Sequence, residues 1–390
     1  MTRRLDDLAG AMLDAARAAG APAADALVVE AVSQSIDIRA GRLEQAERAE
    51  GIDLGLRVLV GGRQACVSAS DASPATLAAM AERAVAMARE APEDPHAGLA
   101  GPGDLAQTWD LAALALCDDR DDPAAAELEA LAREAEAAAM AVAGIVQVEA
   151  GAGHTRRRMH IAATNGFSGG YARSSRSVSA VAFVGTGTGM ERDWAGESRI
   201  HAADMPDPRG IGRLAAERAL ARMGARKPAT GVFPVLYDER VASSLIGHLL
   251  SAVNGSAIVR GSSWLRDALG TQVLPAGLSV IEDPHRPRIS GSRPFDGEGL
   301  PTQKRMIVHD GVLTGWTLDL ATGRQLGMAS TASAARSTSS PPSPSTSTID
   351  LTADLTAYDE PVDIQAPQDA RELDLDQLGE LGQYVLLVSP

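Results

Sequence analysis

The sequence contains few cysteines and no long apolar run, and each absence excludes a class of protein. Cys66 and Cys117 lie far apart and form no CxxC pair. This spacing predicts two packed thiols in a reducing cytosol, without a disulfide framework. No apolar segment approaches the roughly 18 residues of a membrane helix, and the N-terminus lacks the apolar region of a signal peptide. We therefore expect a cytoplasmic protein with no membrane partner.

Basic residues are also scarce relative to acidic ones. The chain has 36 Lys and Arg against 51 Asp and Glu, which gives a net charge of -15. Binding to nucleic acid requires clustered basic side chains, so this balance argues against a direct nucleic-acid partner. Lysine occurs only at Lys227 and Lys304. We attribute this to genome composition and not to phosphate recognition.

The apolar pattern predicts an α+β fold. Helical spacing from Leu5 to Ala16 is followed by alternation with a period of two, which is typical of an antiparallel meander. Ser73-Pro74 and Asp122-Pro123 then mark helix starts, and Asn165-Gly166 marks a hairpin. The predicted meander strands are 27–38, 43–50, 52–60 and 64–68. The predicted domains are an N-terminal α+β domain at 1–144, a β-rich C-terminal domain with a few helices at 145–328, and a Ser/Thr/Pro-rich segment with an acidic tail at 329–390.

Residues 231–255, GVFPVLYDERVASSLIGHLLSAVNG, predict a buried strand, a turn and a helix that carries His248. A strand that leads into a helix with a histidine is typical of zinc peptidases. However, HExxH is absent, and Ala252 stands where a second ligand would share the helix face. Zinc sites need about three converging ligands, so the sequence predicts a core or cleft histidine.

Two glycine-rich runs and one acidic turn are further candidates. Residues 166–170 match GxSxG, but a strand follows where the nucleophile motif requires a helix, so we interpret them as a hairpin. Residues 185–189, GTGTG, predict a loop. In the run 290–311, Asp296 and Glu298 alternate with glycines, and Arg305 lies nearby. Paired acids there can orient a substrate backbone, brace basic residues, or simply cap their own turn.

The run FDGEGLPTQKRMIVHDGVLTGWTLDLATGRQLG at 295–327, together with residues 231–255, resembles the TldD/PmbA family, the "modulator of DNA gyrase" proteins. Within it, the chain is similar to the PmbA/TldE-like branch. The resemblance extends from about Asp25 to about Asp350. Beyond that point we expect a shortened or divergent C-terminus. STASAARS at 330–337 stands where relatives have an STGNA-like run, so Ala332 replaces a glycine and Ser333 an amide.

The resemblance implies a bacterial metallopeptidase complex of two related subunits that degrades or processes small or unfolded peptides. The TldD-like zinc peptidase subunit carries an HExxxH helix and a cysteine ligand. The PmbA-like subunit has the same fold without them. The family's metal helix falls on 245–254, where Gly247, His248 and Ala252 stand about where the first His, the Glu and the second His would be. We therefore expect this chain to be the non-catalytic subunit, with no bound cofactor and with zinc in its heterodimer partner. Alone, the chain could form a homodimer.

From these patterns, the residues expected to line a substrate-binding cleft are Asp296, Glu298, Arg305 and His248. No residue is assigned a catalytic or metal-binding role. Two other functions stay open from the sequence. One is a stand-alone hydrolase that uses His248. The other is a non-enzymatic binding protein that modulates gyrase or a toxin–antitoxin system.

Overall fold

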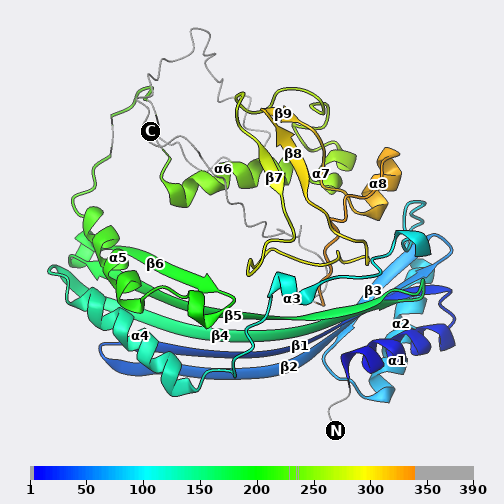
Figure 1. The fold of residues 1–390 in the computed structure, drawn as a ribbon, viewed down its shortest axis with the longest axis horizontal. Helices are drawn as coiled ribbons and strands as arrows, with labels where there is room; N and C mark the ends of the chain where they lie inside the picture. Colours follow the sequence, from blue (N-terminus) through cyan, green and yellow to red (C-terminus); the bar gives the residue numbers. More distant parts are fainter. Residues whose placement is uncertain (1–3, 228, 234, 236, 339–390) are drawn as a thin grey trace.

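The computed structural model describes residues 4–227, 229–233, 235 and 237–338. Its main element is a curved antiparallel sheet with six strands in the order β3-β2-β1-β4-β5-β6 (Figure 1). Above this sheet lies a smaller unit that contains a three-stranded sheet, β7-β8-β9, and several helices. The predicted α+β class is confirmed. The strands of the large sheet are β1 (Ala23–Arg39), β2 (Arg42–Val60), β3 (Arg63–Ala69), β4 (Ile145–Ala163), β5 (Ser168–Val184) and β6 (Glu191–Arg199).

Four helices cover one face of the large sheet, two at each end (Figure 1). In β1, Ala24, Ala26 and Val28 pack into one core with the first pair of helices. Farther along β1, Ile36 and Ile38 pack into a second core with the other pair. These residues share a face because side chains two apart in a strand point the same way. The helices are α1 (Leu5–Ala18) and α2 (Pro74–Glu90) at one end, and α4 (Ala125–Met140) and α5 (Pro208–Ala221) at the other.

The opposite face of the large sheet supports residues 239–338, here called the C-terminal lobe. Its own core includes Ile307, Val308 and Leu313. Phe295 joins the lobe to the sheet through edge-on contacts with Trp109 and Phe167, at centroid distances of 4.9 and 5.0 Å. The lobe contains α6 (Glu239–Ala252), α7 (Gly255–Arg260), β7 (Val280–Glu282), β8 (Arg305–His309), β9 (Val312–Leu313) and α8 (Leu320–Leu326). The short helix α3 (Leu111–Leu114) lies in the connection between α2 and α4.

Local signals in the sequence place several elements correctly. Ser73 caps α2 by accepting a hydrogen bond from the backbone N–H of Thr76, and Pro74 begins the helix. Asn165-Gly166 connects β4 to β5. Among the helices in the described ranges, none has the length and apolar character needed to cross a membrane.

Two expected features of the strands are wrong. β2 is one continuous strand and is not interrupted at Gly51, because it remains paired with β1 on both sides of that residue. The expected buried strand at 231–237 is not formed by the described residues of that stretch. Val232 is fully exposed there, and Phe233 is 57% exposed. The physical reason is that no described strand lies beside this stretch to hydrogen-bond with it.

The expected domain boundary at residue 144 falls between α4 and β4. The large sheet continues across this position, because β4 pairs with β1 along most of its length. In the third expected domain, 329–390, residues 339–390 lie outside the described part of the chain. Residues 329–338 are described and form neither helix nor strand.

Candidate functional site

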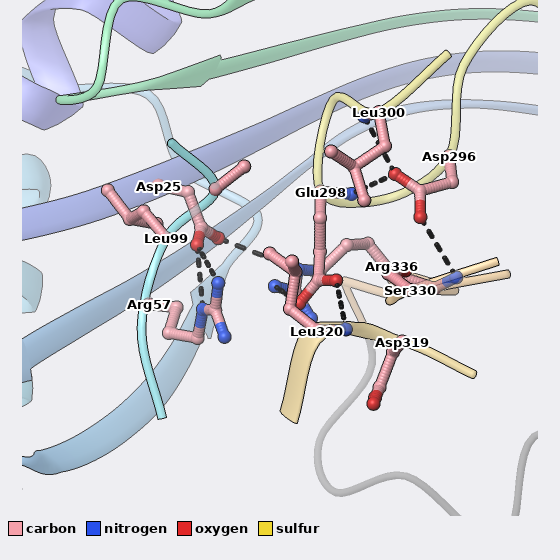
Figure 2. A network of polar contacts seen from close by, with 12 residues as sticks. Asp25, Arg57, Leu99, Asp296, Glu298, Leu300, Asp319, Leu320, Ser330 and Arg336 are labelled. Carbon is pink, nitrogen blue, oxygen red and sulfur yellow. Dashed lines mark hydrogen bonds and ion pairs between the residues drawn. The ribbon is translucent and has the colours of Figure 1, made fainter. Parts of the chain in front are cut away.

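Asp296 lies at the centre of a tight turn in the C-terminal lobe and is 2% exposed. Its Oδ1 atom accepts hydrogen bonds from the backbone N–H groups of Glu298 (2.8 Å) and Leu300 (3.0 Å). Its Oδ2 atom accepts from the backbone N–H of Ala334 at 3.1 Å (Figure 2). Burial raises the pKa of Asp296, although these three donors favour the ionised form. Both carboxylate oxygens are therefore used to hold the chain's own backbone.

Glu298 is also buried, with 5% of its side chain exposed. Its Oε2 atom accepts a hydrogen bond from the backbone N–H of Leu320 at 2.9 Å, in the first turn of α8 (Figure 2). Its Oε1 atom lies 3.6 Å from Nη2 of Arg336. Burial raises the pKa of Glu298, while Arg336 acts to lower it. This carboxylate thus connects α8 to the segment after residue 330.

Arg336 continues the connection to the large sheet. Its Nε atom lies 3.6 Å from Oδ1 of Asp25 in β1. Asp25 Oδ2 in turn accepts hydrogen bonds from Nε (2.7 Å) and Nη2 (2.5 Å) of Arg57 in β2. We call the four side chains Arg57, Asp25, Arg336 and Glu298 the interlobe network (Figure 2). The network holds the C-terminal lobe against the sheet with alternating charges.

Arg305 belongs to a separate buried cluster inside the C-terminal lobe. Its Nε atom donates to Oε2 of Glu282 at 2.7 Å, and Nη1 donates to the carbonyl oxygen of Trp316 at 2.9 Å. Arg293 donates to the other oxygen of Glu282 at 2.8 Å. Glu282 is 6% exposed, so its charge is neutralised by two arginines away from water. Arg305 therefore braces the small sheet.

A core or cleft position was expected for His248, and its exposure on α6 makes the core alternative wrong. The residue four positions later on this helix is Ala252. In the described ranges, no three His, Cys, Asp or Glu side chains are grouped so that they could hold a metal ion. The residues on α6 do not fit a zinc site. The structure thus brings Asp296 and Glu298 together and places Arg305 and His248 elsewhere.

Other groups with possible chemistry are also accounted for by the fold. Ser168, in the GxSxG run, is the first residue of β5 and not the start of a helix, so the hairpin interpretation holds. Its Oγ atom is 2.9 Å from Nε2 of His160 on the neighbouring strand. Both cysteines are free, but Cys66 is exposed, so the expectation of two packed thiols is wrong for that residue. Cys117 is half-buried and its Sγ atom lies 2.9 Å from Nη1 of Arg156.

Asp25 and Arg57 were not among the candidates from the sequence. Each is a charged residue within a short apolar run, AADALVV for Asp25 and LGLRVLV for Arg57. In the structure the two residues lie opposite each other on paired strands. A charge inside a buried strand is the signal that could have identified them, because such a charge needs a partner.

Comparisons with known proteins identify the family. Models of the PmbA/TldA metallopeptidase match domain 1 at residues 24–88, the central domain at 118–223 and the C-terminal domain at 230–363. The metalloprotease PmbA of Escherichia coli O157:H7 is 33% identical over 309 residues, which cover 79% of this chain and 68% of that protein. This chain belongs to the PmbA/TldD family. A metalloprotease PmbA homolog of Haemophilus influenzae is 31% identical and covers 82% of this chain and 70% of its own length.

Solved structures share the PmbA/TldD fold. A proposed modulator of DNA gyrase from Bacteroides thetaiotaomicron superposes with a TM-score of 0.79 at 26% identity, over 84% of this chain and 75% of that one. TldE from Thermococcus kodakarensis gives a TM-score of 0.68 at 16% identity, over 84% and 74%, which shows the fold alone. In this PmbA/TldD-family chain, α6, the Asp296 turn and Arg336 all lie within the match to the C-terminal domain.

Proposed function

We propose that this PmbA/TldD-family chain is one subunit of a cytoplasmic metallopeptidase complex. It would be the subunit without the zinc ligands. Its partner would be a TldD-like zinc peptidase subunit, and the substrate a small or unfolded peptide. The observation that carries the proposal is α6. Where the resemblance places the first His, the Glu and the second His of the zinc helix, α6 has Gly247, an exposed His248 and Ala252. Only one of these side chains is able to bind a metal ion.

In this proposal, the chain contributes shape and peptide-binding surface, and the partner contributes the reaction. Asp296, Glu298 and Arg305 all make hydrogen bonds within the C-terminal lobe. We therefore assign Asp296 and Arg305 to bracing the lobe, and Glu298 to linking the lobe to the sheet through Arg336, and none of them to direct contact with peptide. The names of the relatives support the peptidase activity of the complex, since they are described as metalloproteases.

Co-expression with a TldD-like subunit tests the proposal. We expect the two chains to co-purify, zinc to be present in the pair and absent from this chain alone, and cleavage of an unfolded peptide to require both chains. His248→Ala in this chain is expected to leave the activity of the pair unchanged. A purified single chain that holds stoichiometric zinc and cleaves peptide, and loses both with His248→Ala, would instead establish the stand-alone hydrolase. A pull-down that captures gyrase and no peptidase subunit would favour the binding protein.

A further inference from the structure

The first half of β2 has an open backbone edge. β1 pairs with β2 from Arg42 to Leu59, but β3 pairs with it only from Leu54 to Val60. Within the described part of the chain, no strand or loop pairs with the outer edge of residues 42–53. β2 lies at the lower border of the sheet in Figure 1. Unpaired backbone groups in a regular strand are a template for one further strand.

The regular part of this edge begins after a bulge. Asp37 in β1 pairs with Gln45, whereas Ile38 pairs with Leu43, so Glu44 is an extra residue in β2. From residue 45 to 53 the pairing with β1 is uninterrupted. We call residues 45–53 the open β2 edge. It offers nine residues of extended backbone to a ligand.

The charges of the open β2 edge differ between its two faces. Leu54 and Leu56 point to the helix side of the sheet, which fixes the direction of the other side chains by alternation. On the helix side lie Ala46, Arg48, Glu50 and Ile52, and on the side of the C-terminal lobe lie Gln45, Glu47, Ala49, Gly51 and Asp53. Arg48 and Glu50 neutralise each other through a hydrogen bond of 2.8 Å. The lobe side has only carboxylate charges, and both Glu47 and Asp53 are exposed.

A second copy of β2 fits this edge poorly. In an antiparallel pair centred on Glu47 or Glu50, identical carboxylates would lie opposite each other, which is unfavourable. Centring on Arg48 would oppose two guanidinium groups. Centring on Ala49 would bring the hairpin tip of the second copy, near Gly41, opposite residues 54–57, where β3 already pairs with β2. The charges on this edge thus select against self-pairing, as charged edge strands commonly do.

We propose that the open β2 edge binds an extended peptide that carries two basic side chains six residues apart. Such a peptide would add a seventh strand to the sheet, with roughly six to eight backbone hydrogen bonds. Its basic side chains would face Glu47 and Asp53, and the residues between them would lie over Ala49 and Gly51, where nothing larger than a methyl group projects. The distance of six residues between the two basic side chains is required whether the peptide runs parallel or antiparallel to β2. The proposed function enters this proposal at one point, the choice of a peptide as the ligand.

Binding to this chain alone, measured by fluorescence anisotropy, tests the proposal without the TldD-like subunit. The probe is a labelled, capped heptapeptide of alternating Thr and Val with Lys at the first and seventh positions. We expect saturable binding that weakens with added salt. An isomer with the second Lys at the sixth position should bind at least about fivefold more weakly, because that Lys would face the Arg48 side. Methylation of a single backbone nitrogen of the peptide should abolish binding when that N–H points toward β2, which is true of every second residue, and should have little effect at the other residues.

Two variants of the protein provide matched controls. Glu47→Lys and Glu50→Lys make the same charge change on the same exposed strand, but on opposite faces. We expect Glu47→Lys to weaken binding by about fivefold or more, and Glu50→Lys by less than about twofold. Equal binding of the two isomers, equal effects of the two variants, or no binding of any peptide would each overturn the proposal. None of these results depends on whether the chain co-purifies with a peptidase subunit.

Discussion

Replacing Asp25 with asparagine removes the carboxylate that lies between Arg57 and Arg336 in the interlobe network. The side chains of Asp25 and Arg57 are only 11% and 10% exposed. After the change, Arg57 keeps only neutral side-chain acceptors, the amide oxygen of the introduced asparagine and Oε1 of Gln64 at 3.3 Å, and loses its carboxylate partner. Arg336 keeps only Glu298, at 3.6 Å. Two guanidinium charges would then lie together with a single carboxylate, and water has little access to Arg57.

The expected loss in the free energy of unfolding is about 3–5 kcal/mol, the usual range when one partner of a buried ion pair is removed. In a chain of this size such a loss lowers the melting temperature by roughly 10 °C. Arg57→Met should have a similar cost, because it leaves Asp25 buried with Arg336 as its only charged neighbour. The double variant should cost less than the sum of the single variants by about 1–3 kcal/mol, since neither orphaned charge remains.

Urea unfolding gives these values, and hydrogen exchange in β1 and β2 shows whether the loss is local to the sheet. Asp53→Asn is the matched control, because Asp53 is exposed on β2 and should change stability by less than about 0.5 kcal/mol. The reasoning is refuted if Asp25→Asn costs less than about 1 kcal/mol, or if the two single effects simply add.

Two further predictions concern backbone strain and pH. Ala332 has a φ of +53°, which favours glycine, so Ala332→Gly should stabilise the protein by about 0.5–1 kcal/mol in urea unfolding; Ala334→Gly is the control and should destabilise it. Burial acts to raise the pKa of Asp193, but hydrogen bonds from Arg240 and a backbone N–H lower it overall. Its contribution to stability is therefore complete above the ordinary value of 3.8 and is lost as the pH falls through the lower folded value. The difference in unfolding free energy between the wild type and Asp193→Asn should be constant near neutral pH and shrink in acid; a difference that grows in acid would contradict this assignment.

Local chemistry explains which elements could be predicted from the sequence. The cap at Ser73 and the hairpin at Asn165-Gly166 depend on residues next to each other in the chain. The turn at Asp310-Gly311, which connects β8 to β9, has the same local origin. Asp310 and Gly311 both have positive φ angles, 48° and 79°, as this tight turn requires. In contrast, a strand needs a neighbour, so the apolar run at 231–237 is not sufficient to predict one.

The pairing of Asp25 with Arg57 depends on a single bulge residue, Glu44, which the sequence does not reveal. The meander and its turn near Gly41 are predictable, and they imply a register for β1 against β2. In the structure, the extra residue Glu44 shifts this register by one. Without the bulge, Asp25 would lie opposite Leu56, and a buried charge would face an apolar side chain. Nothing in the local sequence fixes a bulge, so the pairing with Arg57 could not be deduced.

The same limit applies to the predicted site. The sequence identified Asp296 and Glu298 as an unusual pair, and the structure shows both buried. Asp296 caps its own turn at Glu298 and Leu300, which was one of the alternatives from the sequence. The remaining backbone partners, Ala334 for Asp296 and Leu320 for Glu298, come from other segments of the lobe. Only the tertiary structure reveals that these carboxylates also bind those distant backbone N–H groups. Ala332 follows in the segment that Asp296 holds through Ala334, and its left-handed φ is one that favours glycine.

The distribution of charge suggests where this chain meets other molecules. The buried charges of the interlobe network serve the contact between the C-terminal lobe and the sheet, and those around Glu282 brace the lobe itself. Among the described residues, two surfaces stand out as exposed: the apolar side chains of Val232 and Phe233, and the open β2 edge. These lie on separate units, the first before α6 and the second in the large sheet. The proposed binding of a peptide at the open β2 edge therefore leaves the apolar stretch before α6 available for the proposed contact with a second subunit.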